Sequence, residues 1–311
     1  MRKFIGYEIL INNFRNRCTN NTLSHAHLIA GEDGIGKSKL ANILAKLILN
    51  GELDREYVDI INYRSDKASF GVDDVRNIIE EVSKKPFEGD KKVVIIHEGN
   101  KLTIQAQNAL LKTIEEPPKG VYIIILCESL ELILDTIKSR CEIYKLTPLT
   151  KEELYEYIKI KEFNYSENEI KSAIAFSEGI PGRIDRYFND DTLKELRSKI
   201  IDLIKDLNKN NVEVILQHEE KLIGLKDNKE EVLNILGGFI RDILIHKEIE
   251  NKDFIINGDK IDDINELTKE MSFRKLNNMI MTIEEARKNI KSNVSWAMIL
   301  RVMLMGFMEG W

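Results

Sequence analysis

The sequence is poor in the patterns that mark secreted, zinc-binding and membrane-spanning chains. Its three cysteines, Cys18, Cys127 and Cys141, are odd in number and none stands in a CxxC spacing. This favours a reducing cytoplasm and excludes a cysteine-rich zinc site. No apolar run approaches the roughly 18 residues that cross a bilayer, and the opening MRKFIGYEIL lacks the apolar core of a signal peptide. We therefore expect a cytoplasmic protein without zinc and without a membrane segment.

The chain also lacks an excess of positive charge. It has 46 Lys and Arg against 52 Asp and Glu, a formal net charge of −6. Because tight nucleic-acid binding depends on neutralising phosphates, we expect no strong binding of nucleic acid by this chain alone, although one face could still be basic. With 43% hydrophobic and 32% charged residues the chain is globular, and 311 residues predict two or three domains.

What the sequence does contain is a complete phosphate-binding loop, GEDGIGKS at 31–38. It lies between HLIA at 27–30, which is typical of a short buried strand, and an amphipathic stretch at 37–49, which is typical of a helix. Glycines let backbone N–H groups curl around phosphate oxygens. We assign nucleotide binding to Gly31, Gly34, Ile35, Gly36, Lys37, Ser38 and Lys39. The alternative is a glycine-rich turn without a ligand.

Within this loop, Lys37 is expected to reach the β- and γ-phosphates of ATP or ADP, and the Ser38 hydroxyl to ligate Mg²⁺. The partner motif is incomplete. VVII at 93–96 is typical of a central parallel strand, which in P-loop ATPases ends in an acidic residue that holds the metal. Here His97 occupies that position and Glu98 follows. Imidazole is a poor ligand for Mg²⁺, which prefers oxygen.

We therefore predict nucleotide binding with slow or absent hydrolysis. Glu98 is the candidate that could polarise water. The alternative interpretation of His97, an ordinary polar residue at the end of a strand, leads to the same expectation for hydrolysis.

Apolar strands and amphipathic helices alternate over residues 1–147, which is the pattern of a parallel α/β sheet. The expected strands lie at 27–30, 57–61, 93–96, 121–126 and 142–145, and the expected helices at 37–49, 72–84, 103–115 and 130–139. Pro117 ends the third of these helices, since proline cannot continue one. The sequence thus predicts a first domain over 1–147.

Two further domains are expected after this sheet. In 148–190 the pairs Thr150/Glu153 and Ser166/Glu169 form capping boxes that start helices, and EGIPGR at 178–183 marks turns. From 191 to 311 the apolar spacing is helical throughout. The last stretch, 294–311, is rich in methionine, which indicates bundle core more than a membrane or cofactor element.

Four stretches, in this order, resemble the AAA+ clamp-loader family of DNA replication. They are SHAHLIAGEDGIGKSKLA at 24–41, KKVVIIHEGNKLTIQAQNALLKTIEEPP at 91–118, TIKSRC at 136–141 and EGIPGR at 178–183. The second is the most specific, since the family's usual form is nearly identical after an Asp-Glu pair. The resemblance covers about the first 190 residues. It implies an α/β AAA+ P-loop domain with a parallel sheet, a small helical lid domain and an all-α collar domain that joins subunits.

The resemblance also implies roles for individual residues. Arg140 of TIKSRC would be a trans arginine finger, a fixed guanidinium that stabilises charge on the phosphoryl group held by a neighbouring subunit. The alternative is a surface arginine in an ordinary salt bridge. Arg183 of EGIPGR would be a sensor that contacts nucleotide phosphate. Thr103 would cap a helix whose free N–H groups, with Lys101, bind a DNA phosphate; an ordinary capped helix is the alternative.

Three departures from the family pattern matter. His97 replaces the metal-holding aspartate, and Cys127 with Glu128 stand where motor subunits place a sensor threonine or asparagine. Residues 50–59 contain no cysteine, whereas the family often has a four-cysteine zinc module there. These departures are those of a subunit that is not a motor.

The leading hypothesis is a noncatalytic or weakly catalytic clamp-loader subunit. Its partners would be the other subunits of the loader, the sliding clamp indirectly, and primed DNA through the complex. A second hypothesis is an ATP-hydrolysing motor subunit that tolerates His97. A third, an unrelated P-loop switch or repair ATPase, is disfavoured by AQNALLKTIEEPP and SRC together.

Overall fold

A computed structural model describes residues 4–64, 69–161, 165–208, 212–225, 228–249, 254–290, 292 and 294–309. The chain forms two compact units. The first consists of Met1–Glu162 with Gly179–Gly182, and the second of Phe163–Glu178 with Arg183–Trp311. The division into domains 1–147, 148–190 and 191–311 stays a prediction.

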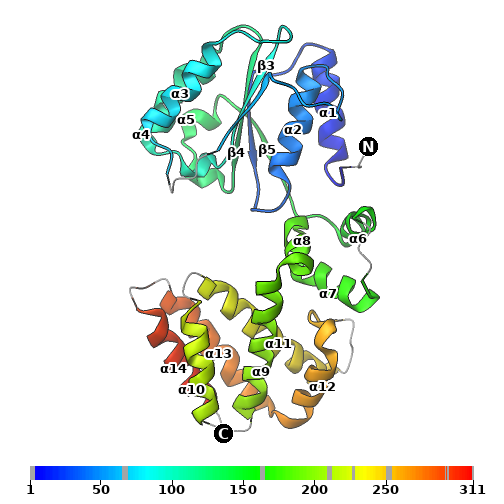
Figure 1. Ribbon diagram of the computed structural model, residues 1–311, viewed down its shortest axis with the longest axis vertical. Coiled ribbons are helices and arrows are strands. Elements are labelled where there is room, and N and C mark those ends of the chain that lie inside the picture. Colours follow the sequence, from blue (N-terminus) through cyan, green and yellow to red (C-terminus); the bar gives the residue numbers. More distant parts are fainter. Residues whose placement is uncertain are drawn as a thin grey trace. The chain divides into compact units, whose positions relative to one another are not determined.

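The first unit is built on a five-stranded sheet in the order β2-β3-β4-β1-β5, with every neighbouring pair parallel (Figure 1). The strands are β1 (Ala26–Ala30), β2 (Ile60–Tyr63), β3 (Lys92–Ile96), β4 (Val121–Cys127) and β5 (Glu142–Lys145). Residues of the central strands β1, β3 and β4 are buried on both faces, which explains their nearly continuous apolar sequences. The predicted parallel α/β sheet is confirmed.

Helices cover both faces of this sheet. On one face lie α1 (Glu8–Thr19) and α2 (Lys37–Ile48); on the other lie α3 (Val72–Ser83), α4 (Ile104–Glu115) and the short α5 (Asp135–Lys138) (Figure 1). Successive side chains along each strand point to opposite faces of the sheet and so contribute to two separate hydrophobic cores. Ile29 and Ile95 pack with Phe14 and Leu44 under α1 and α2, whereas Leu28 belongs to the core under the other helices.

Two predicted element boundaries in this unit are wrong. The strand expected at 57–61 runs from Ile60 to Tyr63. Just before it, buried Asp59 accepts the N–H groups of Phe87 at 2.6 Å and Glu88 at 2.8 Å with its carboxylate. The helix expected at 130–139 is a 3₁₀ turn, Leu130–Leu132, followed by α5. Helix α1 was not predicted at all.

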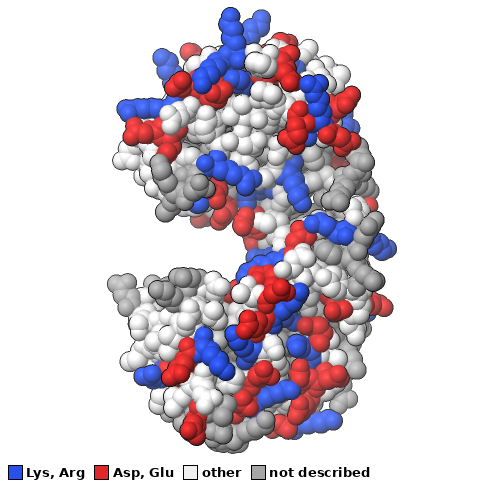
Figure 2. Space-filling model, in the orientation of Figure 1, with Lys and Arg blue, Asp and Glu red and all other residues white. Residues whose placement is uncertain are grey.

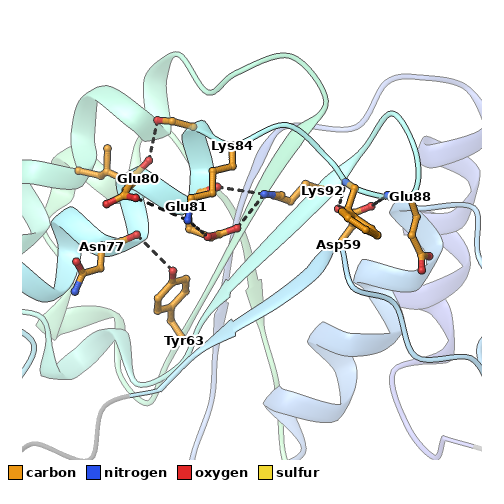
Figure 3. Close-up of polar contacts among 11 residues, drawn as sticks. Asp59, Tyr63, Asn77, Glu80, Glu81, Lys84, Glu88 and Lys92 are labelled. Atoms are coloured by element: carbon orange, nitrogen blue, oxygen red, sulfur yellow. Dashed lines mark hydrogen bonds and ion pairs between the residues drawn. The ribbon is translucent and has the colours of Figure 1, made fainter.

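A polar network fixes the amino-terminal end of β3 (Figure 3). Lys92, buried at 3% exposure, donates to the Glu81 carboxylate at 3.1 Å and to the Glu81 carbonyl at 3.3 Å. Lys84 holds the same carboxylate at 2.9 Å. Bonds to both lysines lower the pKa of Glu81, that to Lys84 most. These contacts tie α3 to the strand whose opposite end carries His97.

The chain leaves this unit through a capped helix and returns to it briefly. Helix α6 (Lys151–Ile160) begins at the predicted capping box, in which Thr150 accepts the Glu153 N–H at 3.2 Å and Glu153 accepts the Thr150 N–H at 2.8 Å. In the segment Gly179–Gly182, the Gly179 carbonyl accepts the Leu149 N–H at 2.8 Å. The chain turns at Glu178 and Gly179, which have positive φ, but Pro181 already begins a helix, so the turn predicted over 178–183 is shorter than expected.

The second unit is helical in its described residues. Its helices are α7 (Glu167–Ser177), α8 (Pro181–Asn189, which starts in the returning segment), α9 (Asp191–Asn208), α10 (Val212–Ile223), α11 (Lys229–Ile249), α12 (Ile261–Glu270), α13 (Phe273–Ile290) and α14 (Trp296–Glu309). One core runs through α9 to α14, with Phe239 and Phe307 fully buried in it. The methionine-rich terminal stretch packs one face into this core, as predicted, with Met303 buried, whereas Met298 and Met305 are exposed. No described helix is long and apolar enough to cross a membrane.

Candidate functional site

The phosphate-binding loop leaves the carboxyl end of β1 and enters α2. Gly34 and Gly36 have φ of 81° and 107°, values that residues with a side chain rarely adopt. Gly36 is the N-cap of α2 and offers no side-chain cap, so the first N–H groups of the helix face the loop without a competing side-chain acceptor. A helix start of this kind favours an anion.

Lys37 lies across this loop. Its ammonium donates to the carbonyls of Gly31 at 2.7 Å and Glu32 at 2.8 Å. Burial lowers the pKa of Lys37, while the negative charges of Asp33 and Glu128, among others, raise it. The negative charge of several acidic groups thus acts on the lysine of the motif.

His97, at the carboxyl end of β3, is 3% exposed and is bonded through both ring nitrogens. Nδ1 lies 3.2 Å from Ser38 Oγ, and Nε2 lies 2.9 Å from Asn62 Oδ1. Because an amide oxygen can only accept, Nε2 carries the proton, and the Ser38 hydroxyl donates to Nδ1. Burial, with a smaller contribution from Arg64, lowers the pKa of His97 to about 4. The imidazole is therefore neutral at physiological pH.

The predicted site residues that follow His97 interact locally, within the segment from Glu98 to the start of α4. Glu98 has a left-handed conformation with φ of 54°, and its carboxylate pairs with Lys101 Nζ at 2.9 Å. Thr103 caps α4 as predicted, with its hydroxyl accepting the Ala106 N–H at 3.2 Å. The candidate water-polarising carboxylate and the candidate DNA-binding lysine thus form one ion pair.

Gln107 is a positioning residue that the sequence analysis missed. Buried in α4, it donates to the carbonyls of Leu102 at 3.1 Å and Leu132 at 3.0 Å, and accepts the Leu134 N–H at 2.8 Å. These bonds hold α4 against the segment that leads to Arg140. A polar residue within AQNALLKT was the available signal.

Arg140 follows α5 and is 37% exposed. Its Nε and Nη2 both lie 2.5 Å from Glu115 Oε1, and Nη1 donates to the Thr136 carbonyl at 2.9 Å and the Ser139 hydroxyl at 3.3 Å. Nearly all of its five N–H donors are therefore used within this chain. The side chain is fixed at the surface.

The arginine and the phosphate loop lie at opposite ends of the sheet. In the parallel pair β1–β5, His27 lies opposite Glu142 and Ala30 opposite Lys145. Arg140 precedes the start of β5, whereas the loop follows the end of β1. At about 3.3 Å per residue the five residues of β1 separate these ends by about 13 Å.

Arg183 and its neighbour Gly182 fall in different units. Arg183 pairs with Glu178 in the second unit. Gly182 belongs to the first, where its N–H donates to the Gly34 carbonyl at 2.9 Å. The sensor role of Arg183 stays a prediction.

The described residues contain no group of three or more His, Cys, Asp and Glu that could hold a metal ion. On the face drawn in Figure 2, basic and acidic side chains are interspersed over the surface of each unit. That face of each unit therefore carries both signs of charge.

Two family models match consecutive parts of the chain: "DNA polymerase III, delta subunit" over residues 6–150 and "DNA polymerase III, delta subunit, C terminal" over residues 192–308. The Bacillus subtilis DNA polymerase III subunit delta prime is 26% identical, with 95% of this chain and 94% of that protein covered. The Haemophilus influenzae subunit delta prime is 32% identical, with 50% of this chain and 53% of that protein covered. The Bacillus subtilis subunit tau is 25% identical, over 92% of this chain and 57% of its own length.

Among solved structures, a DNA polymerase III gamma subunit-related protein from Thermotoga maritima shares the fold, with a TM-score of 0.56 at 16% identity and coverage of 96% and 98%. Fold and site together define an AAA+ P-loop protein. The chain belongs to the family of DNA polymerase III clamp-loader subunits, as its sequence motifs indicated.

Proposed function

We propose that this chain acts as a delta prime-like subunit of the DNA polymerase III clamp loader in the cytoplasm. It supplies Arg140 to the ATP site of a neighbouring gamma/tau-like subunit while the complex loads the sliding clamp onto primed DNA. A delta-like subunit is a further partner. The similarity to delta prime subunits supports this assignment.

The observation that carries the proposal is the separation of Arg140 from the loop of its own chain. Arg140 lies at the amino end of β5 and the loop at the carboxyl end of β1, in parallel strands. A guanidinium in this position serves a phosphate on another molecule. The bond between its Nη1 and the Thr136 carbonyl, and its pair with Glu115, fix it in advance.

The chain's own P-loop is expected to hydrolyse ATP more slowly than the neighbouring subunit's site that Arg140 serves. Neutral His97 gives Ser38 a hydrogen-bond acceptor but supplies no negative oxygen. Glu98 pairs with Lys101. Gly31, Gly34, Ile35, Gly36, Lys37, Ser38 and Lys39 would hold a bound ATP or ADP, with Arg183 as a further phosphate contact. Zinc has no role in this proposal.

The remaining parts act through assembly. Residues 191–311 would form the collar that joins the subunits, and 148–190 the lid. Lys101 and Thr103 would contact a DNA phosphate in the complex, which requires Lys101 to exchange Glu98 for the phosphate.

The second candidate function is an ATP-hydrolysing gamma/tau-like motor, which the similarity to tau favours. Measuring ATP turnover by the isolated chain and by the loader assembled with its motor subunits separates the two. We expect negligible turnover by the isolated chain and full turnover by the complex. Sustained turnover by the isolated chain, abolished by Lys37→Ala, would establish the motor.

A further inference from the structure

The environment of Ser38 does not fit a hydrated magnesium ion. Its hydroxyl donates to Nδ1 of His97, and the other ring nitrogen is bonded to Asn62. At the position where the strand would supply an anionic oxygen to a hard cation, it ends in an imidazole, which offers only nitrogen and whose Nδ1 already accepts from Ser38. Glu98, the acidic residue that follows His97, is paired with Lys101.

The parts of the loop that bind phosphate without a metal are nevertheless intact. Gly34 and Gly36 have the positive φ values that turn backbone N–H groups inward, and α2 begins at Lys37 without a side-chain cap. Lys37 donates to the carbonyl oxygens of Gly31 and Glu32, which a phosphate oxygen can replace as acceptors of charge-assisted bonds.

The charges around the loop set which phosphate ligand fits. Lys37 supplies the positive charge of the motif. The negative charges of Glu32, Asp33 and Glu128 act on it. Without a divalent cation to neutralise it, a triphosphate brings one more negative charge than a diphosphate into these surroundings. Repulsion therefore disfavours the longer chain of phosphates.

We propose that this P-loop binds a nucleoside diphosphate without magnesium, while Ser38 and His97 stay hydrogen-bonded to each other. This rests on the part of the proposed function that places a nucleotide in the chain's own loop. The bound diphosphate is a structural ligand of the first unit and takes part in no turnover. The trans role of Arg140 does not depend on it.

The test is calorimetric titration of the isolated full-length chain with ADP and with ATP, each in excess EDTA and in excess MgCl₂. We expect the Kd for ADP to agree within about twofold between the two buffers, and ATP to bind more weakly than ADP in EDTA. Lys37→Ala should abolish ADP binding, which locates the ligand in the loop. A loss of about tenfold or more in ADP affinity in EDTA would overturn the proposal, and so would absence of ADP binding in both buffers.

Two substitutions of His97 test whether the missing anionic oxygen is the reason that magnesium is not needed. His97→Asp places an anionic oxygen beside Ser38, and we expect ATP then to bind about tenfold or more tightly in MgCl₂ than in EDTA. His97→Asn keeps a neutral oxygen acceptor for Ser38 and should remain indifferent to the metal. Magnesium dependence in both variants would contradict the argument from charge. Thermal melts establish that each variant is folded, and the wild-type titrations decide the proposal if one is not.

These outcomes are separable from failure of the proposed function. The titrations use the isolated chain, whereas the role of Arg140 is measured as turnover of the assembled loader. Failure to bind ADP would remove the structural nucleotide and leave the arginine finger untouched.

Discussion

The guanidinium of Arg140 and the carboxylate of Glu115 form an ion pair with an N–O distance of 2.5 Å, joining the segment after α5 to the last turn of α4. Both side chains are partly exposed, so the pair is worth about 1 kcal/mol or less. A charge-assisted bond to a phosphate is stronger, at about 1.5–3 kcal/mol. A phosphate can therefore bind the guanidinium as the stronger partner while Glu115 keeps the side chain oriented.

Glu115→Gln should lower turnover of the assembled loader by up to about fivefold, since the guanidinium loses the charged partner that fixes it; this corresponds to about 1 kcal/mol. Stability of the isolated chain should change by less than about 1 kcal/mol. Glu116→Gln, at the neighbouring position, is the matched control and should leave turnover unchanged. Equal effects of the two substitutions would show that the Glu115 contact has no part in positioning.

Gly182→Ala should disturb the phosphate loop through direct contact. A Cβ on Gly182 would lie 2.7 Å from Gly34 Cα and 2.9 Å from Gly34 O, which are backbone atoms that cannot move aside cheaply. We expect a loss of about 1–3 kcal/mol in stability and weaker ADP binding by calorimetry. Gly89→Ala is the control, because a Cβ there meets nothing within 4 Å. Unchanged melting and binding in Gly182→Ala would contradict the contact.

His27 makes the stability of the first unit depend on pH. It is fully buried between Phe14 and Tyr144, and burial lowers its pKa from 6.5 to about 4, against a smaller opposing effect of Glu142. Between these values the unfolded chain binds a proton that the folded chain does not. His27 therefore supports full stability above about pH 6.5, and this contribution is lost as the pH falls towards 4, by up to about 3 kcal/mol.

Denaturant unfolding of the wild type and of His27→Phe at a series of pH values between 7 and 4 measures this contribution. We expect the free energy of unfolding to fall less steeply with acidification in the variant, because it has no imidazole to protonate at that site. Parallel curves for the two proteins would show that folding does not lower the pKa of His27.

The sequence was a sufficient guide wherever the decisive contacts are local. The P-loop between β1 and α2, and the capping boxes at Thr150 and Ser166, depend on residues at most seven apart, and the structure has them as predicted. The parallel sheet followed from its buried apolar strands. The family resemblance depended on contiguous motifs of the same kind.

Contacts between distant segments could not be predicted in this way. The helix expected at 130–139 is interrupted because Gln107 of α4 takes the Leu132 carbonyl and the Leu134 N–H that a continuous helix would use. Asn62 completes the bonding of His97 from 35 residues away. Glu115 was recognised only as part of a motif, and its pair with Arg140 appears only in three dimensions.

The central claim is that Arg140 acts in a neighbour's ATP site, and the most direct measurement is turnover by loaders assembled with Arg140→Ala or with Lys37→Ala chains. Removing an arginine finger costs roughly a thousandfold at the site it serves. The account predicts normal assembly of both complexes, a large loss of clamp- and DNA-stimulated ATP turnover with Arg140→Ala, and near wild-type turnover with Lys37→Ala. Full turnover with Arg140→Ala, or a loss confined to Lys37→Ala, would contradict it.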